Sequence, residues 1–263
     1  MNTTWRLLRP ALREAVRGRW LIGVAIGLAL VGELLLRFAG SGVSSLVSLL
    51  DVVLILVPLA GLVVGTMQVH HARELIELLL AQPIRRTRLF AGLWLGIALP
   101  LAVALALGLV TPFAVHGMLV GALAGRVMML VLVAILLAFI STAFAFVIAL
   151  RQDDRVRALA VALGAWLVTA ILWDGVALAI AMLFGTRPIE GPLLAMLALN
   201  PVDIARVLLL LGSDTAAMLG ASGAVLARTL GGVRGQLMLG LLLVAWVVLP
   251  VWWSARTFAR KDF

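Results

Sequence analysis

The chain has 263 residues, of which 64% are hydrophobic and 13% are charged, and its formal net charge at pH 7 is +9. Soluble domains use about 45–50% apolar and about 25% charged residues, so this composition excludes a soluble globular protein and indicates an integral membrane protein. Cysteine is absent, which also excludes disulfides, cysteine-bound metals and thiol nucleophiles.

The first 19 residues are basic and amphipathic. Arg13 and Arg17 belong to an arginine side of the helical wheel that lies beside an apolar side, and Trp5 and Trp20 flank the segment. Arginines and tryptophans in this arrangement are typical of a helix that lies in the membrane interface. The sequence predicts such an anchoring helix over residues 1–19, with a disordered basic leader as the alternative.

Six long apolar runs follow. A bilayer core about 30 Å thick needs about 20 apolar residues per helical span. The predicted spans are Trp20 to Leu36, Leu46 to Met67, Leu89 to Thr111, Val127 to Leu150, Leu159 to Phe184 and Leu237 to Ser254. The sequence therefore predicts an all-α integral membrane protein in which residues 1–263 form one transmembrane domain, with both termini on the same side.

Positive charge is distributed unevenly along the chain. Fifteen of the 21 Lys and Arg residues lie before the first span, in the loops after the second and fourth spans, and after the sixth span. The positive-inside rule predicts that this side, with both termini, is cytoplasmic. The net charge is then an orientation signal and a contact with anionic membrane lipid, so no nucleic-acid partner is expected.

The loop between the second and third spans, residues 68–88, contains a short charged helix pattern. Its segment RELIELLLA is made of strong helix formers, and Arg73 and Glu77 have the i,i+4 spacing of a helical ion pair. Pro83 is expected to end this helix before the basic cluster RRTR. Such a helix can dock into a groove of a soluble partner or lie on lipid headgroups, and the residues alone leave both interpretations open.

Residues 185–236, between the fifth and sixth spans, contain two short apolar segments. The run 193–199 is too short to span a bilayer. Asn200 and Pro201 form a turn and helix-start signal, and Asp203 lies near the beginning of the helix that follows. The pattern predicts a re-entrant or surface-lying helical hairpin on the outer side.

Three carboxylates fall inside predicted spans: Glu33, Asp51 and Asp174. Charged groups in the membrane are costly, so each is a candidate functional residue. Glu33 lies four residues before Arg37 and can pair with it. Asp174 has no basic neighbour in the sequence, which leaves open whether it bonds to a neighbouring helix or contacts a substrate.

Motifs of catalysis are missing from the chain. It contains no Walker A loop, no HExxH and no Gly-x-Ser-x-Gly elbow, and its only lysine is Lys261. Histidine and methionine suit copper, but they do not cluster at metal-ligand spacing in this sequence. We therefore expect a non-catalytic protein without a bound metal or cofactor, and any ATP that drives it would be hydrolysed by a partner chain.

Three segments carry a family resemblance. ELIELLLAQPIRRTRLFAG, from Glu74, resembles the GTLELLLSQPVSRSRLLLGK pattern of ABC-2 permeases, the membrane subunits of ABC transporters. Within that family, WDGVALAIAML (173–183) and LALNPVDIARVLLLLG (197–212) are similar to the permeases of the nitrous-oxide-reductase maturation system. The six spans, the anchoring helix and the short outer helices also match the ABC-2 fold.

The resemblance implies a homodimer in the bacterial inner membrane, bound to a cytoplasmic ABC ATPase that holds ATP and Mg. It implies an ATPase-coupling loop and an outer hairpin. The coupling residues would be Arg73, Glu74, Glu77, Leu78, Pro83, Arg85, Arg86 and Arg88, and the hairpin residues Asn200, Pro201, Asp203 and Arg206. A periplasmic NosD-like protein and a copper chaperone are further implied partners, in copper or sulfur delivery to nitrous oxide reductase.

The chain departs from the family pattern before the leucine run. His70, His71 and Ala72 occupy positions where acidic residues are usual, Glu74-Leu75 replaces Gly-Thr, and Leu93 replaces a lysine. Two alternatives remain open from the sequence: an ABC-2 exporter of a lipid, drug or peptide, and a proton-coupled carrier that uses Asp174 and Glu33.

Overall fold

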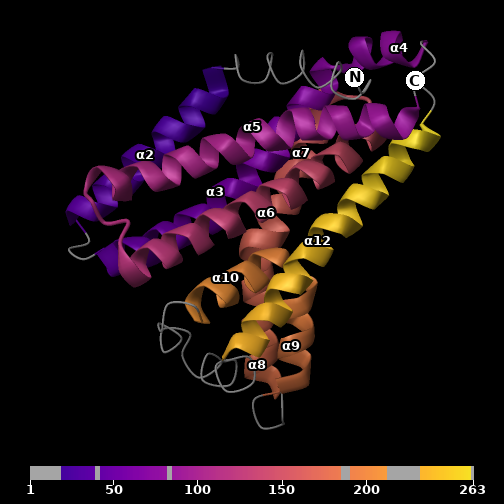
Figure 1. Ribbon diagram of the computed structural model, residues 1–263. Coiled ribbons are helices and arrows are strands. Elements are labelled where there is room, and N and C mark those ends of the chain that lie inside the picture. Colours follow the sequence, from indigo (N-terminus) through magenta and orange to yellow (C-terminus); the bar gives the residue numbers. More distant parts are fainter. Residues whose placement is uncertain (1–18, 39–41, 82–84, 185–189, 212–231, 262–263) are drawn as a thin grey trace.

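A computed structural model describes residues 19–38, 42–81, 85–184, 190–211 and 232–261, and the regular structure within these ranges is entirely helical (Figure 1). Several predictions fall outside these ranges. They concern the anchoring helix with Trp5, Arg13 and Arg17, the helix-ending Pro83, and much of the segment 185–236.

The six predicted spans are confirmed, because six stretches of the described helices are long and apolar enough to cross a membrane. The spanning helices are α2 (Arg19–Phe38), α3 (Gly42–His71), α5 (Arg86–Val115), α6 (Gly121–Arg151), α7 (Arg155–Leu167) with its continuation α8 (Trp173–Phe184), and α12 (Val233–Arg260). A π-helical turn, Val168–Leu172, joins α7 to α8. Three shorter helices are α4 (Arg73–Leu80), α9 (Glu190–Leu199) and α10 (Pro201–Leu211). The chain is a multi-pass membrane protein.

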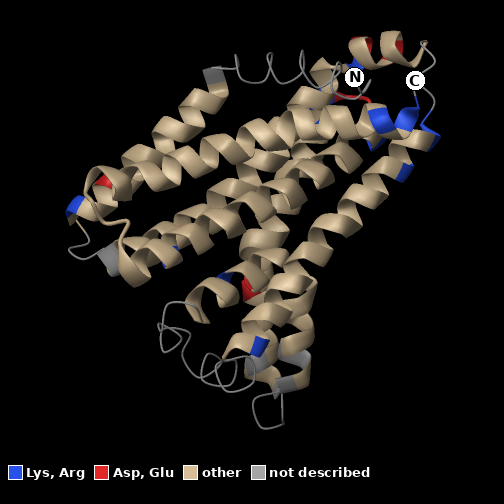
Figure 2. Ribbon diagram, in the orientation of Figure 1, with Lys and Arg blue, Asp and Glu red and all other residues tan. Residues whose placement is uncertain are grey.

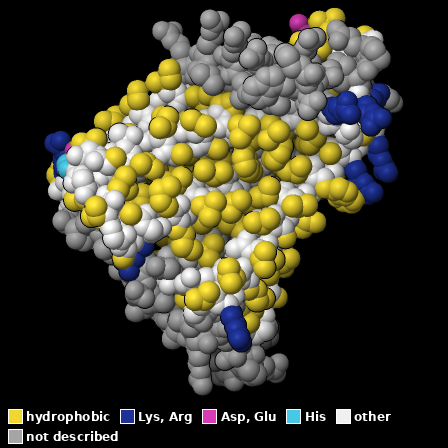
Figure 3. Space-filling model, viewed as in Figure 1, with side chains coloured by type: hydrophobic (Ala, Val, Ile, Leu, Met, Phe, Trp, Pro, Cys, Tyr) yellow, Lys and Arg dark blue, Asp and Glu magenta, His cyan; other side chains and the backbone are white. Residues whose placement is uncertain are grey.

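Helix α6 lies at the centre of the bundle, where it packs against α3, α5 and α12. Its side chains are the most completely enclosed of the six spans, and Leu137 and Phe146 are almost fully buried. Helices α2, α7 and α12 expose much of their apolar surface instead. Figure 3 shows hydrophobic side chains spread over the spans on one face of the molecule, the surface that lipid or another protein would cover.

Two glycines permit close contact between α3 and α6. A Cβ atom on Gly65 would lie 2.6 Å from the Cβ of Ala145, and one on Gly61 would overlap the hydroxyl of Ser141. Small residues four positions apart allow helix backbones to approach closely in membranes, where apolar side chains gain little from leaving lipid. The GLVVG motif at Gly61 to Gly65 is therefore the sequence signal for this contact.

Lys and Arg residues gather at one end of the bundle, where α3 and α6 end and α5 begins (Figure 2). Hydrogen bonds join these helix ends: Arg73 reaches the carbonyl oxygen of Ala149, and Arg86 reaches that of Ala259. We call this the basic end. At the far end, α8, α9 and α10 lie together around the beginning of α12 (Figure 1).

Gly65→Ala is expected to destabilise the protein by about 1–3 kcal/mol, because its methyl group has no room unless α3 and α6 move apart. Thermal unfolding in detergent measures the effect. Gly164→Ala is the matched control, since a Cβ on Gly164 has nothing within 4 Å. Equal unfolding midpoints for wild type and Gly65→Ala would contradict the tight α3–α6 contact.

Candidate functional site

Helix α4 at the basic end has two different faces. Ile76 points inward and is fully buried, whereas Leu75 and Leu78 are 46% and 69% exposed. Glu74 and Glu77 lie on the same exposed side as these leucines. The predicted helix is confirmed. Its leucines lie on two faces, because Leu79 and Leu80 pack inward whereas Leu75 and Leu78 are exposed. The exposed surface of Glu74, Leu75, Glu77 and Leu78, here called the α4 outer face, is a mixed acidic and apolar patch.

The inner face of α4 is anchored in three spans at once. Ile76 shares a buried cluster with Phe90 of α5, Phe146 of α6 and Phe258 of α12. The ring centroids of Phe90 and Phe146 lie 5.4 Å apart in an edge-to-face arrangement, and those of Phe90 and Phe258 lie 6.0 Å apart. The inner face of α4 therefore packs on a buried cluster to which α5, α6 and α12 each contribute an aromatic side chain.

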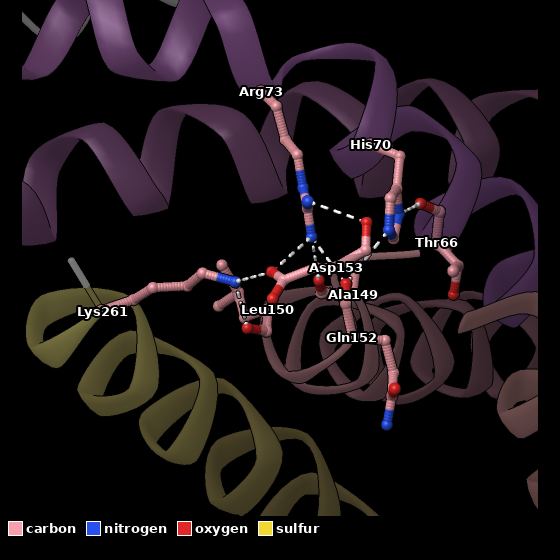
Figure 4. A network of polar contacts seen from close by, with 8 residues as sticks. All are labelled: Thr66, His70, Arg73, Ala149, Leu150, Gln152, Asp153 and Lys261. Atoms are coloured by element: carbon pink, nitrogen blue, oxygen red, sulfur yellow. Dashed lines mark hydrogen bonds and ion pairs between the residues drawn. The ribbon is translucent and has the colours of Figure 1, made fainter. Parts of the chain in front are cut away.

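Arg73 holds α4 against the end of α6, as Figure 4 shows. Its guanidinium donates hydrogen bonds to the carbonyl oxygens of Asp153 (3.0 Å), Gln152 (2.6 Å) and Ala149 (3.1 Å). Basic side chains commonly satisfy the last carbonyls of a helix in this way. The predicted Arg73–Glu77 ion pair is therefore wrong: Arg73 turns inward to α6, and Glu77 is left on the α4 outer face.

His70 takes part in the same contact (Figure 4). Its Nε2 lies 3.2 Å from the carbonyl oxygen of Gln152, and its Nδ1 lies 2.9 Å from that of Thr66. An acidic side chain here could not donate to these oxygens. The departure from the usual family pattern at position 70 thus has a structural counterpart, which sequence spacing did not reveal because Gln152 is 82 residues away.

Lys261 connects the end of α12 to the same network (Figure 4). Its ammonium group donates to the carbonyl oxygen of Leu150 at 2.6 Å and to a carboxylate oxygen of Asp153 at 3.2 Å. The hydrogen bond from Lys261 lowers the pKa of Asp153 below its usual value, and the charges of Lys261 and Arg73 act in the same direction. Asp153 therefore stays ionised at neutral pH and holds both cations.

The remaining predicted coupling residues separate into two groups. Arg86 is exposed but donates to the carbonyl oxygens of Ala259 (3.0 Å) and Lys261 (2.9 Å), which ties the start of α5 to the end of α12. Arg85 and Arg88 are exposed beside it. Arg73 and Arg86 thus bond to the ends of other helices within the protein. Arg85, Arg88 and the α4 outer face are left for contact with a partner or with lipid.

At the far end, Asn200 joins the hairpin of α9 and α10 to the fifth span. Its buried side chain accepts a hydrogen bond from the backbone N–H of Val202 and donates to the carbonyl oxygen of Thr169 at 2.8 Å. Thr169 belongs to the π-helical turn, and such turns often occur at functional positions. Pro201 is the first residue of α10, as predicted, and is buried.

Two tryptophans donate hydrogen bonds to carbonyl groups at the end of α9. The indole of Trp246 on α12 donates to the carbonyl oxygen of Ala198 at 2.9 Å, and the indole of Trp173 on α8 donates to that of Met196 at 3.3 Å. The hairpin is thereby attached to both the fifth and the sixth spans. Two short helices broken at Asn200 are confirmed, while their depth in a membrane stays a prediction.

The carboxylates predicted to lie inside spans have different environments. Asp174 pairs with Arg206 of α10 at 2.8 Å, and the same guanidinium lies 3.5 Å from Asp203. Asp174 thus bonds to a neighbouring helix, one of the two outcomes that the sequence left open. Glu33 pairs with Arg37 at 2.8 Å as predicted, and also with His116 at 2.9 Å. Asp51 is exposed on α3.

An apolar cavity of about 170 Å³ lies beside the Asn200 junction. Its walls include Pro58 on α3, Ser141 on α6, Thr169 and Trp246.

Trp20, a predicted interface anchor, is partly buried and packs against the core of the spans. Within the described residues no group of His, Asp and Glu could hold a metal ion.

Arg73→Gln is expected to loosen the end of α6 and the loop that follows, because losing the bonds to three carbonyl groups costs about 1–3 kcal/mol. Hydrogen–deuterium exchange of residues 149–155 should become faster in detergent-solubilised protein. Arg88→Gln, at an exposed position on the same side, is the control and should leave the exchange unchanged. Equal exchange in both variants would contradict the role of Arg73 as a clamp.

The Asp174–Arg206 pair is expected to stabilise the far end. A double-mutant cycle of Asp174→Asn and Arg206→Gln should give a coupling of about 0.5–1 kcal/mol in thermal unfolding, the lower part of the range for contacting residues, because Asp174 is 47% exposed. The Glu33–Arg37 pair is the comparison, since Arg37 is 69% exposed and exposed pairs give about 0.2–1 kcal/mol. Additive effects of Asp174→Asn and Arg206→Gln would show that the pair contributes nothing.

Comparison with known proteins agrees with this architecture. A family model described as ABC-2 family transporter protein matches residues 6–263. The chain is 27% identical, over an alignment of 279 residues that covers 99% of each chain, to the "Probable ABC transporter permease protein NosY" of Stutzerimonas stutzeri. With six candidate spans and a family match over nearly its whole length, the chain belongs to the ABC-2 family of transporter proteins.

Proposed function

We propose that the chain is a permease subunit whose helix α4 receives the movement of a cytoplasmic ABC ATPase and passes it to the spans. The observation that carries the proposal is that α4 has one buried and one exposed face. Ile76 is fully buried in a cluster shared with three spans, while Leu78 on the α4 outer face is 69% exposed. An exposed leucine beside two glutamates at the basic end of a membrane protein is suited to a groove on another protein.

The basic end is the cytoplasmic side in this proposal. Ten Lys and Arg residues lie at this end, and the positive-inside rule favours keeping such a concentration of positive charge in the cytoplasm. They are Arg73, Arg85, Arg86, Arg88, Arg151, Arg155, Arg157, Arg256, Arg260 and Lys261, with Asp153 among them. The protein then lies in the bacterial inner membrane with both termini in the cytoplasm.

The ATPase supplies the chemistry, and this chain supplies the mechanical connection. ATP and Mg bind the partner, and closure of a pair of ATPases pushes the α4 outer faces of a permease homodimer. The push reaches α5, α6 and α12 through the Ile76 cluster. Helix α12 carries it to the far end, where Trp246 is bonded to the end of α9. Movement at one end is thus converted into a change of packing at the other.

The cargo and the outer partners form the finer part of the proposal. The relative from Stutzerimonas stutzeri is called a permease protein NosY, and the chain resembles the permeases of nitrous-oxide-reductase maturation. We infer a role in copper or sulfur delivery to that enzyme, with a periplasmic NosD-like protein and a copper chaperone as partners. The proton-coupled carrier has less support, because Asp174 and Glu33 each lie in an ion pair with an arginine.

A mild-detergent pull-down of the tagged chain from its native membranes tests this assignment. A co-purifying soluble chain with a Walker A motif and ATP hydrolysis would support a permease subunit, and a secreted repeat protein in addition would support the NosD-like arrangement. An ATPase alone would favour an exporter of a lipid, drug or peptide. Absence of any ATPase across several detergents would contradict the proposal.

Leu78→Ser is expected to reduce the permease-stimulated ATP hydrolysis of the purified complex by roughly tenfold, because an exposed leucine buried in a partner contributes up to about 1.5–3 kcal/mol. Glu77→Arg, which reverses a charge on the same face, should have a similar effect. Val156→Ser is the control, since Val156 is also exposed at the basic end but lies off α4. Membrane insertion should be equal for all three variants, and normal stimulation in Leu78→Ser would remove α4 as the coupling helix.

A further inference from the structure

An open groove of about 750 Å³ lies at the basic end between the last turns of α6 and α12. Its walls carry the side chains of Arg151, Trp252, Trp253, Arg256 and Arg260. This volume is within the range of about 300–1,000 Å³ that small-molecule sites occupy. The groove is separate from the α4 outer face, and nothing in the proposed coupling of ATPase to spans uses it.

Two arginines of the groove lie over the rings of its tryptophans. The guanidinium carbon of Arg256 lies 3.9 Å from the ring centroid of Trp252, and that of Arg151 lies 4.8 Å from the ring centroid of Trp253. A guanidinium stacked by its face keeps its N–H groups free at the edge, where they can donate to a phosphate or carboxylate. Stacking therefore orients two cations without neutralising them.

The positive charge of the groove is not balanced by its own surroundings. Among the described residues, Arg151, Arg256 and Arg260 form no ion pair with a carboxylate. Asp153, the carboxylate in the groove wall, is already bonded to Lys261 and lies 3.5 Å from Arg73. The helix-end carbonyls of Leu150 and Ala259 are likewise occupied, by Lys261 and Arg86. Three arginines thus remain available for an external anion.

The position of the groove along the spans indicates the source of that anion. Helix α12 has 28 residues and is therefore about 42 Å long, which exceeds the bilayer core of about 30 Å. Its last turns reach the headgroup region, where Trp252 and Trp253 are 53% and 41% exposed. Exposed tryptophans are enriched at this depth because one part of the indole is apolar and the other can contact water.

We propose that this groove binds the headgroup of an anionic phospholipid, with the phosphate between the Arg151 and Arg256 guanidinium groups and the acyl chains along the exposed side of α12. Basic pockets between spans on the cytoplasmic side suit such headgroups. A zwitterionic choline lipid carries a second, cationic group that the arginines repel, so the groove discriminates between the two lipid classes. The assignment requires membrane embedding alone and is independent of the proposed ATPase.

Native mass spectrometry of the full-length chain in detergent tests the site, with phosphatidylglycerol and phosphatidylcholine as probes. Arg151→Gln with Arg256→Gln should weaken phosphatidylglycerol binding by about tenfold or more, since each arginine near anionic lipid contributes substantially to affinity. Arg155→Gln with Arg157→Gln is the matched control, because it removes the same charge from exposed positions at the same end. The control should change binding by less than about twofold.

A second pair of variants keeps the charge and protects the test against misfolding. Arg151→Lys with Arg256→Lys should bind phosphatidylglycerol more weakly than wild type but more tightly than the glutamine variant, because lysine retains attraction without the stacked, planar geometry. Equal losses in the groove variant and the control would mean a general charge effect and overturn the site. Equal binding of phosphatidylcholine, or full competition by inorganic phosphate at the same concentration, would overturn the lipid assignment.

Discussion

The structure depends on one constraint, which is that the last backbone carbonyl groups of a helix have no partner within the helix and need donors from elsewhere. In a membrane protein an unsatisfied carbonyl is costly, because lipid offers no hydrogen bond. At the basic end the donors are Arg73, Arg86 and Lys261. At the far end they are the amide of Asn200 and the indoles of Trp173 and Trp246. Each donor lies in a different segment of the chain from its acceptor, so satisfying the carbonyls also joins the helices.

The hydrogen bonds join the helices at both ends of the bundle, and tight packing of α3 against α6 holds its centre. Helix α6 is the most enclosed span, and the small residues of α3 press directly against it. The fifth span differs, because a π-helical turn interrupts it beside the cavity and the Asn200 junction. A wider turn next to empty space can change its packing more easily than a regular helix in a filled core. Under the proposed function, the far end is therefore the part of the fold that would respond to movement at α4.

The basic end serves several contacts without one excluding another. Arginines at its centre bind helix ends, the α4 outer face presents leucine and glutamate, and the groove beside Trp252 presents unpaired guanidinium groups. The role of each arginine thus depends on whether its guanidinium group lies beside a carbonyl group, an indole ring or only solvent. A count of arginines along the chain predicts the side of the membrane but cannot separate these roles.

The sequence by itself determined the membrane class, the six spans, the short helix over 73–80 and the break at Asn200, because each depends on hydrophobic length or on local helix signals that act within a few residues. The Glu33–Arg37 pair was also predictable, since its partners are four residues apart. Only the tertiary structure decided that Arg73 leaves Glu77 for the end of α6, that Asp174 pairs with Arg206, and that His70 reaches Gln152. These choices join residues 32 to 82 positions apart, and the packing of the spans sets which distant carbonyl or carboxylate lies nearest to each donor.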